Sequence, residues 1–351
     1  MKKYPLSPMT AFRQSKIDRI MLVILLLLTV PGTCSGEELL LQAVGDLMLG
    51  GRWEAQMSRD GYRYPFARLA GELRKGDLTL ANLEAPLTRR GEEYRDKRFR
   101  FRVDPAAAAA LRWAGITTVT LANNHSMDFG MTGLRDTIAC LDKAGIGWCG
   151  AGADLAEAGQ VRFFALKGRT VALLAVSLTL PEQFWATQRS GGTMPLQERR
   201  LREAITAARG QADIVLVTVH WGEEGTARLR PYQPRLARMM IDSGADVVIG
   251  HHPHVVQGVE RYRRGLIFYS LGNFVFAAKS RLNGHGLMVR LRLNGKVRSA
   301  ELLPIATAYR EVGFQPRLMY GAEAELALEQ VRRISPGLVL RRENGAYLVD
   351  F

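Results

Sequence analysis

Residues 244–260 read GADVVIGHHPHVVQGVE, a short apolar run that ends in a cluster of histidines. The β-branched run at 247–249 is typical of a strand that is buried on both faces. A residue before proline is pushed into an extended conformation, which predicts that His252 and His254 share one face and that His251 points away. Two converging imidazoles on a fixed backbone are typical of a transition-metal site. The alternative is a surface turn that is rich in histidine.

The same arrangement, an apolar run followed by polar residues, recurs along the chain. ELLLQAV precedes GD at 45–46, DLTLA precedes NLE at 82–84, ITTVTLA precedes NNH at 123–125, DIVLVTV precedes HWGEE at 220–224, and LIFYS precedes LGNF at 271–274. Helical patterns lie between these runs, at about 104–115, 131–145, 195–210 and 234–244. Apolar strands that alternate with helices predict an α/β fold with a largely buried central sheet.

The polar clusters sit where the predicted strands end, and in open α/β sheets ligands bind at the carboxyl ends of strands. Five of the six histidines lie in these clusters, and His285 is the exception. A lone histidine is usually a core residue with satisfied hydrogen bonds, but five at one edge of a sheet predict a metal or catalytic site. The candidate residues are Asp46, Glu84, Asn124, His125, His220, His252 and His254.

The ordered set of segments resembles the capsule-synthesis CapA family, also called the poly-gamma-glutamate biosynthesis family. The matching segments are VGDLMLG, ANLEAPLT, FRFRVDP, LANNHSMDFG, VTVHWGEE, GADVVIGHHPHVVQGVE and IFYSLGNFVF, over about residues 40–279. That family is similar to the calcineurin-like metallophosphoesterases. The resemblance therefore implies a β-sandwich flanked by helices, in a four-layer αββα arrangement, with two metal ions above the sandwich.

The resemblance also implies a role for each residue. Glu84 would bridge the two metals and His125 would act near the leaving group. The other implied ligands are Asp46, Asn124, His220, His252 and His254. One departure is Met48, where the first motif of those enzymes has a histidine. A thioether is a poor ligand for hard divalent metals, so one metal position is a ligand short if Met48 faces the site with Asp46, as the two-residue period of a strand predicts.

Three further features bear on the substrate. Glu223 could orient a metal ligand or bind substrate, or be a solvated acid of a loop, and Asn273 could polarise a ligand or cap a turn. Residues 95–103 read RDKRFRFRV, so as a strand they would present one cationic and one apolar face. Guanidinium groups bind carboxylate and phosphate in bidentate fashion, although such charges also keep exposed strand edges from aggregating. The candidate cations are Arg98, Arg100 and Arg102.

The N-terminal residues 1–36 have the pattern of an export signal. A basic leader precedes an apolar run of eleven residues at 20–30, and small residues follow it. Eleven residues are fewer than the about 20 of a membrane span, yet the basic flank leaves an uncleaved N-terminal anchor open. The rest of the chain is expected to form a metallophosphoesterase-like domain at 37–304 and a C-terminal extension at 305–351. Two cysteines in the domain, Cys140 and Cys149, could pair in an oxidising compartment or stay free.

The net charge of +14 favours anionic partners. For a protein outside the cytoplasm these are anionic polymers or lipid headgroups, and no nucleic-acid motif is present, so nucleic acid is not an expected partner. The sequence thus predicts an exported, periplasmic or extracytoplasmic metal-binding protein of capsule biosynthesis. It would carry one or two divalent ions (Mn, Fe or Zn) and hydrolyse an anionic polymer such as poly-gamma-glutamate, beside membrane-embedded capsule synthesis components. The alternative is a non-catalytic assembly or polymer-binding subunit, which Met48 favours and the Asn124–His125 pair does not.

Overall fold

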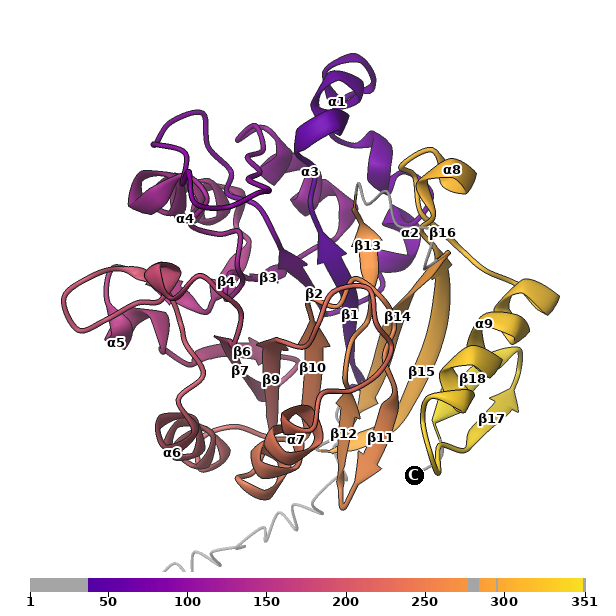
Figure 1. Cartoon of the computed structure of the whole chain (residues 1–351). Coiled ribbons are helices and arrows are strands. Elements are labelled where there is room, and N and C mark those ends of the chain that lie inside the picture. Colours follow the sequence, from indigo (N-terminus) through magenta and orange to yellow (C-terminus); the bar gives the residue numbers. More distant parts are fainter. Residues whose placement is uncertain (1–36, 277–283, 295, 350–351) are drawn as a thin grey trace, which may run out of the picture. The chain divides into compact units, whose positions relative to one another are not determined.

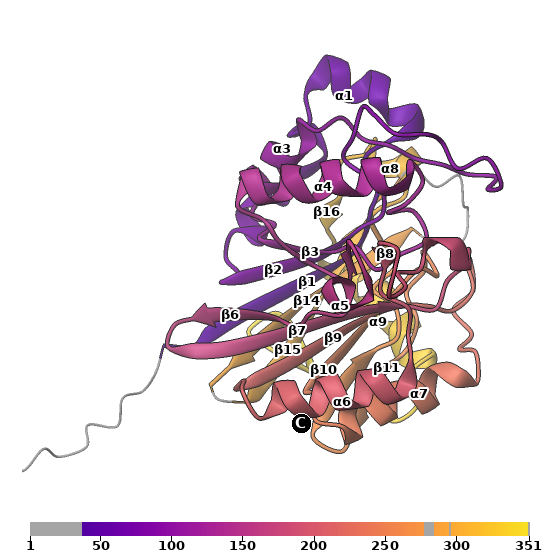
Figure 2. The same cartoon turned by 90° about the vertical axis from the view of Figure 1, so that its left-hand side faces the viewer.

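Two β-sheets stacked face to face form the centre of the protein, and helices cover both outer faces (Figures 1 and 2). The computed structural model describes residues 37–276, 284–294 and 296–349. Within them the four layers of the predicted αββα arrangement are present, which confirms the fold class. The predicted single central sheet is replaced by two sheets, both of which supply the strand ends identified in the sequence. The predicted signal or anchor at 1–36 lies outside the described residues.

The first sheet is mixed and has the order β17-β18-β15-β14-β1-β2-β3-β4, with β13 pairing β1 and β16 pairing β15. β1, β2, β3 and β4 run parallel, whereas β14 and β15 form an antiparallel hairpin beside β1. Its strands are β1 (Leu39–Leu47), β2 (Leu78–Leu83), β3 (Thr118–Thr120), β4 (Gly147–Cys149), β13 (Asn273–Val275), β14 (His285–Leu293), β15 (Val297–Ala306), β16 (Arg317–Leu318), β17 (Leu340–Glu343) and β18 (Ala346–Val349).

The second sheet has the order β11-β12-β10-β9-β7-β6, and its central strands β7, β9, β10 and β12 are parallel. Its strands are β6 (Arg162–Leu166), β7 (Arg169–Ser177), β9 (Ile214–His220), β10 (Val247–His251), β11 (Val259–Tyr262) and β12 (Gly265–Phe268). A separate short pair joins β5 (Ala151–Gly152) to β8 (Gly192–Thr193).

Apolar side chains fill the space between the layers. Leu41 and Leu80 of the first sheet share one buried cluster with Leu173 and Leu216 of the second, as expected for strands that are apolar on both faces. The outer face of the first sheet packs on α3 and α4, and that of the second on α6 and α7. The helices are α1 (Glu54–Asp60), α2 (Ala70–Leu73), α3 (Ala107–Ala114), α4 (Gly130–Ala144), α5 (Leu155–Ala158), α6 (Glu198–Arg209), α7 (Tyr232–Asp242), α8 (Tyr309–Val312) and α9 (Gly321–Arg333), and the short 3-10 helices are η1 (Gly51–Trp53), η2 (Tyr64–Phe66) and η3 (Glu182–Phe184).

The helical patterns of the sequence correspond to α3, α4, α6 and α7, with ends that differ by a few residues. Residues after Pro304 continue the first sheet, because β16 and β18 both pair with β15. Leu328 and Val331 of α9 belong to the same buried cluster as the two sheets. The segment 305–349 therefore shares the core of the residues that precede it.

Both cysteines of the described chain are free: Cys149 is buried between the sheets and Cys140 is half-buried on α4. Burial raises the pKa of the Cys149 thiol to about 12. Among the described residues, no helix combines the length and the apolar character that crossing a bilayer requires.

The carboxyl end of β1 lies between β2 and β13, which fixes the position of Asp46. Asp46 is in register with Asn82 of β2 and Asn273 of β13, and its amide donates to the carbonyl of Gly272 at 2.9 Å. The register shifts at Asp46/Leu47, and such an irregularity breaks the alternation of side chains. Leu47, Met48 and Leu49 accordingly lie in one apolar cluster on the helix side, so the expected shared face of Asp46 and Met48 is wrong.

A glycine is required just before Asp46. A Cβ added at Gly45 would lie 1.8 Å from the carbonyl oxygen of Gly272, so Gly45→Ala should force β1 and β13 apart. We expect a loss of about 1–3 kcal/mol or more in the free energy of unfolding, measured by urea denaturation. Gly71→Ala is the matched control, because an added Cβ there meets nothing within 4 Å and alanine favours the helix. Equal stability of the two variants would contradict the close approach.

Candidate metal centre

The polar clusters of the two sheets meet at one place. Asp46 lies near the carboxyl end of β1, Glu84 follows β2, and Asn124 and His125 follow β3, all in the first sheet. His220 ends β9, and His252 and His254 follow β10, both in the second sheet. All seven side chains are buried or nearly so. The structure therefore brings the seven predicted residues together at a shared edge of the two sheets.

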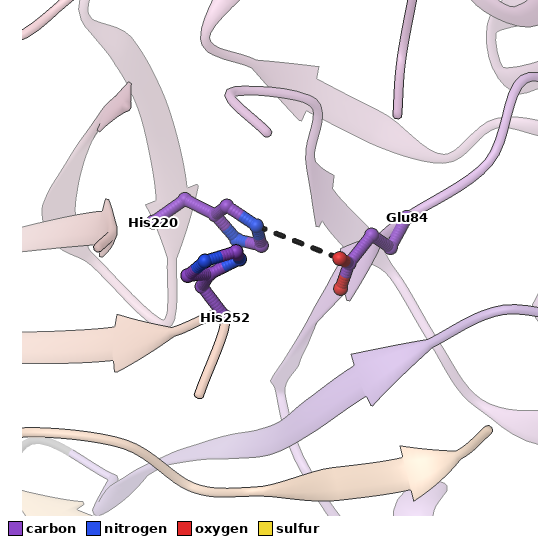
Figure 3. Close-up of side chains that lie close together, drawn as sticks. All are labelled: Glu84, His220 and His252. Carbon is purple, nitrogen blue, oxygen red and sulfur yellow. Dashed lines mark ion pairs between the residues drawn. The ribbon is translucent and has the colours of Figure 1, made fainter. Parts of the chain in front are cut away.

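Three groups of side chains have ligand atoms within 4.8 Å of one another. The first is Glu84, His220 and His252, which point toward one another in Figure 3, with His220 Nε2 3.5 Å from Glu84 Oε1. The second is Asp46, Glu84 and His254. Glu84 belongs to both groups, which is the arrangement of a carboxylate that can bridge two ions. The Asn124 amide oxygen joins the first group at 2.9 Å from His220 Nε2. The third group is Glu224, His252 and His254.

Several buried polar atoms of this site have no hydrogen-bond partner within the described chain. Glu84 Oε1, His252 Nδ1 and Asn273 Oδ1 are examples. A buried polar atom without a partner costs about 1–3 kcal/mol, so such atoms are rare in folded proteins. Carboxylate and amide oxygens with imidazole nitrogens are ligands of Mn, Fe and Zn. The side chains at the site therefore fit divalent metal ions.

The two carboxylates of the site differ in their electrostatics. Burial would raise the pKa of Asp46, but the His251 and His254 imidazoles beside it outweigh burial and hold the pKa well below its usual value. Burial raises the pKa of Glu84 well above its usual value, despite the opposing charge of His254. The charge of His254 thus does not offset the burial of Glu84, and a metal ion would supply further positive charge beside it.

The pKa values of the imidazoles also shift in opposite directions. Burial would lower the pKa of His254, but the carboxylates of Glu84 and Asp46 raise it to about 9. Burial and then the positive charge of His254 lower the pKa of His252 to about 3. Burial also holds the pKa of His220 well below its usual value. His220 and His252 are therefore neutral at pH 7, the form that binds metal.

The backbone of the histidine turn differs from the prediction. His252 has φ +97° and His254 has φ +56°, so neither is extended as the following proline predicted for His252. Their convergence comes from a turn with left-handed residues, in which the His252 amide donates to Asp46 Oδ2 at 3.3 Å. His251 was expected to face away, yet its Nδ1 lies 3.2 Å from Asp46 Oδ1. Residues with φ in this region are unfavourable and collect at functional sites.

A second cluster surrounds His125. Its Nδ1 lies 2.6 Å from Asp128 Oδ2, and Lys97 Nζ lies 2.6 Å from Asp128 Oδ1. Lys97 also donates to the carbonyl oxygen of Asn124. Burial lowers the pKa of His125, although Asp128 opposes this, so the ring is neutral at pH 7. The Asp128 carboxylate accepts hydrogen bonds, which favours the His125 tautomer with its proton on Nδ1 and leaves Nε2 as the nitrogen that can accept one.

The comparisons with known proteins identify the family of this chain. The family described as "Bacterial capsule synthesis protein PGA_cap" matches residues 40–278, well over half of the chain. This chain is a member of that family. The match confirms the resemblance drawn from the ordered segments, whose range was about 40–279.

Two relatives are similar to this chain over about two thirds of its length. "Capsule biosynthesis protein CapA" of Bacillus anthracis is 34% identical over 247 residues, which are 68% of this chain and 60% of the relative. "PGA biosynthesis protein CapA" of Bacillus subtilis (strain 168) is 34% identical over 246 residues, 70% of this chain and 65% of the relative. The match thus spans less than two thirds of the length of either relative. A solved structure of a hypothetical protein from Thermus thermophilus shares the fold, with a TM-score of 0.50 and 18% identity over 76% of this chain and 98% of that one.

Within this capsule synthesis family member, two asparagines that sequence reasoning missed support the ligands. Asn82 Nδ2 donates to Asp46 Oδ1 at 2.9 Å and to Glu84 Oε2 at 3.1 Å. Asn123 Nδ2 donates to Asn82 Oδ1 at 3.0 Å, and Asn123 Oδ1 accepts from the amide of His125. A polar residue between apolar ones in a buried strand was the signal for Asn82. Asp128, three residues after His125, and Lys97 were missed as well.

The predicted cationic ribbon at 95–103 is wrong. The segment is irregular and forms only the bridge between Val103 and Leu87. Arg100 pairs with Glu93 at 2.8 Å, while Arg98 and Arg102 are exposed over the rings of neighbouring aromatic residues. The apolar residues share no face either, because Phe99 is 57% exposed and Phe101 lies 4.7 Å from the His125 ring.

The acid after His220 also differs from the prediction. Glu223 is exposed and its carboxylate lies 2.6 Å from Arg230, so the structure does not bring it to the metal centre. The next residue, Glu224, has its carboxylate within the third group of candidate ligands. Asn273 does lie at the site, opposite Asp46 in the sheet.

His252 belongs to two of the three ligand groups and His251 to none. We expect His252→Ala to lower the affinity for metal by more than about 10–100-fold, the loss typical of a residue that only supports a ligand. His251→Ala should retain more metal. Elemental analysis of the full-length variants after identical dialysis measures the difference, with thermal unfolding as the check on folding. Equal loss from the two folded variants would contradict the grouping.

Proposed function

We propose that this family member is a metal-dependent hydrolase that cleaves an amide or phosphoester bond in an anionic capsule polymer such as poly-gamma-glutamate. One observation carries the proposal: unpartnered buried atoms of Glu84 and His252 belong to one compact group with His220. Membership in a capsule synthesis family supports the polymer as the substrate class.

The residues of the site divide the work of hydrolysis. Divalent ions bound there would act as Lewis acids, lowering the pKa of water from 15.7 toward about 7 and neutralising charge on the attacked group. The implied ligand set is Asp46, Glu84, Asn124, His220, His252 and His254. Asn82 holds both carboxylates of the set in place through its amide, at 2.9 Å and 3.1 Å.

His125 is the residue placed to move a proton. With Nδ1 bound to Asp128, Nε2 can accept a proton and return it to the departing amine or alcohol. Asp128 would stabilise the positive ring that forms between these two events. The neutral state of His125 at pH 7 supports this role, because a base must have a free lone pair.

The loop that carries Lys97 and Phe101 contacts His125 and also exposes Arg98 and Arg102. We propose that these arginines, rather than a cationic strand, guide the acidic polymer to the site. The apolar run at 20–30 supports export or anchoring, which would place the protein at the extracytoplasmic face of the membrane beside membrane-embedded capsule synthesis components.

A second candidate function is a non-catalytic polymer-binding or assembly subunit of a capsule synthesis and export complex. Met48 favours it, because this residue packs in the apolar core where the related enzymes supply a histidine ligand. The His125–Asp128–Lys97 arrangement favours the enzyme, since binding a polymer does not require an oriented proton carrier.

His125→Asn tests the two functions. If the protein is a hydrolase, the variant should lose about 10²–10⁴-fold in turnover while its metal content stays unchanged. Turnover is measured on poly-gamma-glutamate and on bis-p-nitrophenyl phosphate with the full-length, metal-loaded protein. Full activity of the variant would remove His125 from the mechanism. A wild-type protein that binds metal and poly-gamma-glutamate but cleaves neither substrate would support the subunit instead.

A further inference from the structure

Glu224 lies beside the metal centre but outside the ligand set that the family resemblance implies. Its carboxylate is within 4.8 Å of ligand nitrogens of both His252 and His254. Two atoms bound about 2.1 Å from one ion are at most about 4.2 Å apart, so a small side-chain movement would let Glu224 and a histidine share an ion. Within the described chain, no lysine or arginine forms a salt bridge with Glu224, whereas the carboxylate of the adjacent Glu223 lies 2.6 Å from Arg230.

The loop that carries Glu224 is fastened to the histidine turn. The amide of Gly225 donates to the carbonyl of Pro253 at 2.9 Å, and Gln257 Nε2 donates to the carbonyl of Thr226 at 3.0 Å. Gln257 is itself held by Gln233 at 2.9 Å, and both glutamines are fully buried. The Glu224 side chain is exposed. These hydrogen bonds hold the backbone of its loop beside the turn that carries His252 and His254.

One of the two metal positions has fewer candidate ligands than the other. Glu84, His220 and His252, with the amide oxygen of Asn124, supply the first position. Asp46, Glu84 and His254 supply the second with only three residues. Because Met48 lies in the apolar cluster on the helix side, it does not complete this second group.

We infer that Glu224 is a metal ligand that completes the second position, with Asp46, Glu84 and His254, in place of a histidine at residue 48. The inference rests on the proposed metal centre and adds a ligand to it. An exposed carboxylate at the solvent side of a buried group makes the second position the more accessible of the two. It also predicts that the second position prefers ions that accept oxygen ligands, such as Mn²⁺.

The test compares Glu224→Gln with Glu223→Gln in the metal-free, full-length protein. Mn²⁺ is titrated in and the free ion is counted by electron paramagnetic resonance. We expect the wild-type protein and Glu223→Gln to bind two ions, and Glu224→Gln to lose affinity for the second ion by about 10–100-fold or more. Glu224→His, which supplies a neutral nitrogen ligand in place of the carboxylate, should bind the second ion more tightly than Glu224→Gln does. Both glutamates are exposed, so the fold should be unaffected, as thermal unfolding without metal would verify.

Each other outcome overturns a distinct statement. If Glu224→Gln binds Mn²⁺ as the wild-type protein does, Glu224 is not a ligand and the proposed metal centre still stands. If Glu223→Gln loses the second ion equally, the effect is one of net charge and the ligand assignment fails. If the wild-type protein binds no Mn²⁺, the proposed centre fails for this ion and the inference fails with it.

Discussion

The carboxylate of Asp46 is the interaction on which the site depends, because it joins the two sheets at their strand ends. One oxygen accepts from Asn82 of the first sheet and lies 3.2 Å from His251 of the second. The other accepts from the amide of His252 and lies 3.0 Å from His254. The carboxylate is fully buried, and breaking such a buried arrangement by removing one partner costs about 3–5 kcal/mol. The same contacts that hold the sheets together therefore aim the histidines.

Glu84 is equally buried, but the hydrogen bond from Asn82 and the charge of His254 do not offset its burial. Its Oε1 has no hydrogen bond in the described chain, and burial drives its pKa up. Nearby, His220 and His252 have their pKa values driven down by burial. Buried polar groups that are not fully compensated lower the stability of the folded protein. Divalent ions would satisfy the carboxylate and the neutral imidazoles together, and for this reason metal binding explains the site better than packing does.

The residues that form the site were predicted correctly from the sequence, but the backbone geometry that brings them together was not. Apolar strands with polar ends are a local pattern, so the α/β class and the seven clustered residues could be predicted from it, whereas the αββα layers followed only from the family resemblance. The left-handed turn at His252 could not be predicted, because it depends on the hydrogen bond to Asp46, a residue distant in the sequence. The position of Met48 depends on an irregularity of β1 against β13. The role of Lys97 could not be predicted either, because its partner Asp128 is distant in the sequence and lies on another loop.

Asp128 links the basic loop to the proton carrier, which bears on the choice between enzyme and binding subunit. Its carboxylate accepts hydrogen bonds from Lys97 Nζ, from the amide of Phe101 and from His125 Nδ1. Its backbone carbonyl accepts from the amide of Tyr94 at 2.9 Å. Four contacts from one residue thus fix the loop and the ring as a unit. A polymer that bound the exposed side of this loop would lie next to an imidazole already oriented and in its neutral form. A subunit that only held the polymer would need the loop alone, whereas catalysis needs both parts in this arrangement.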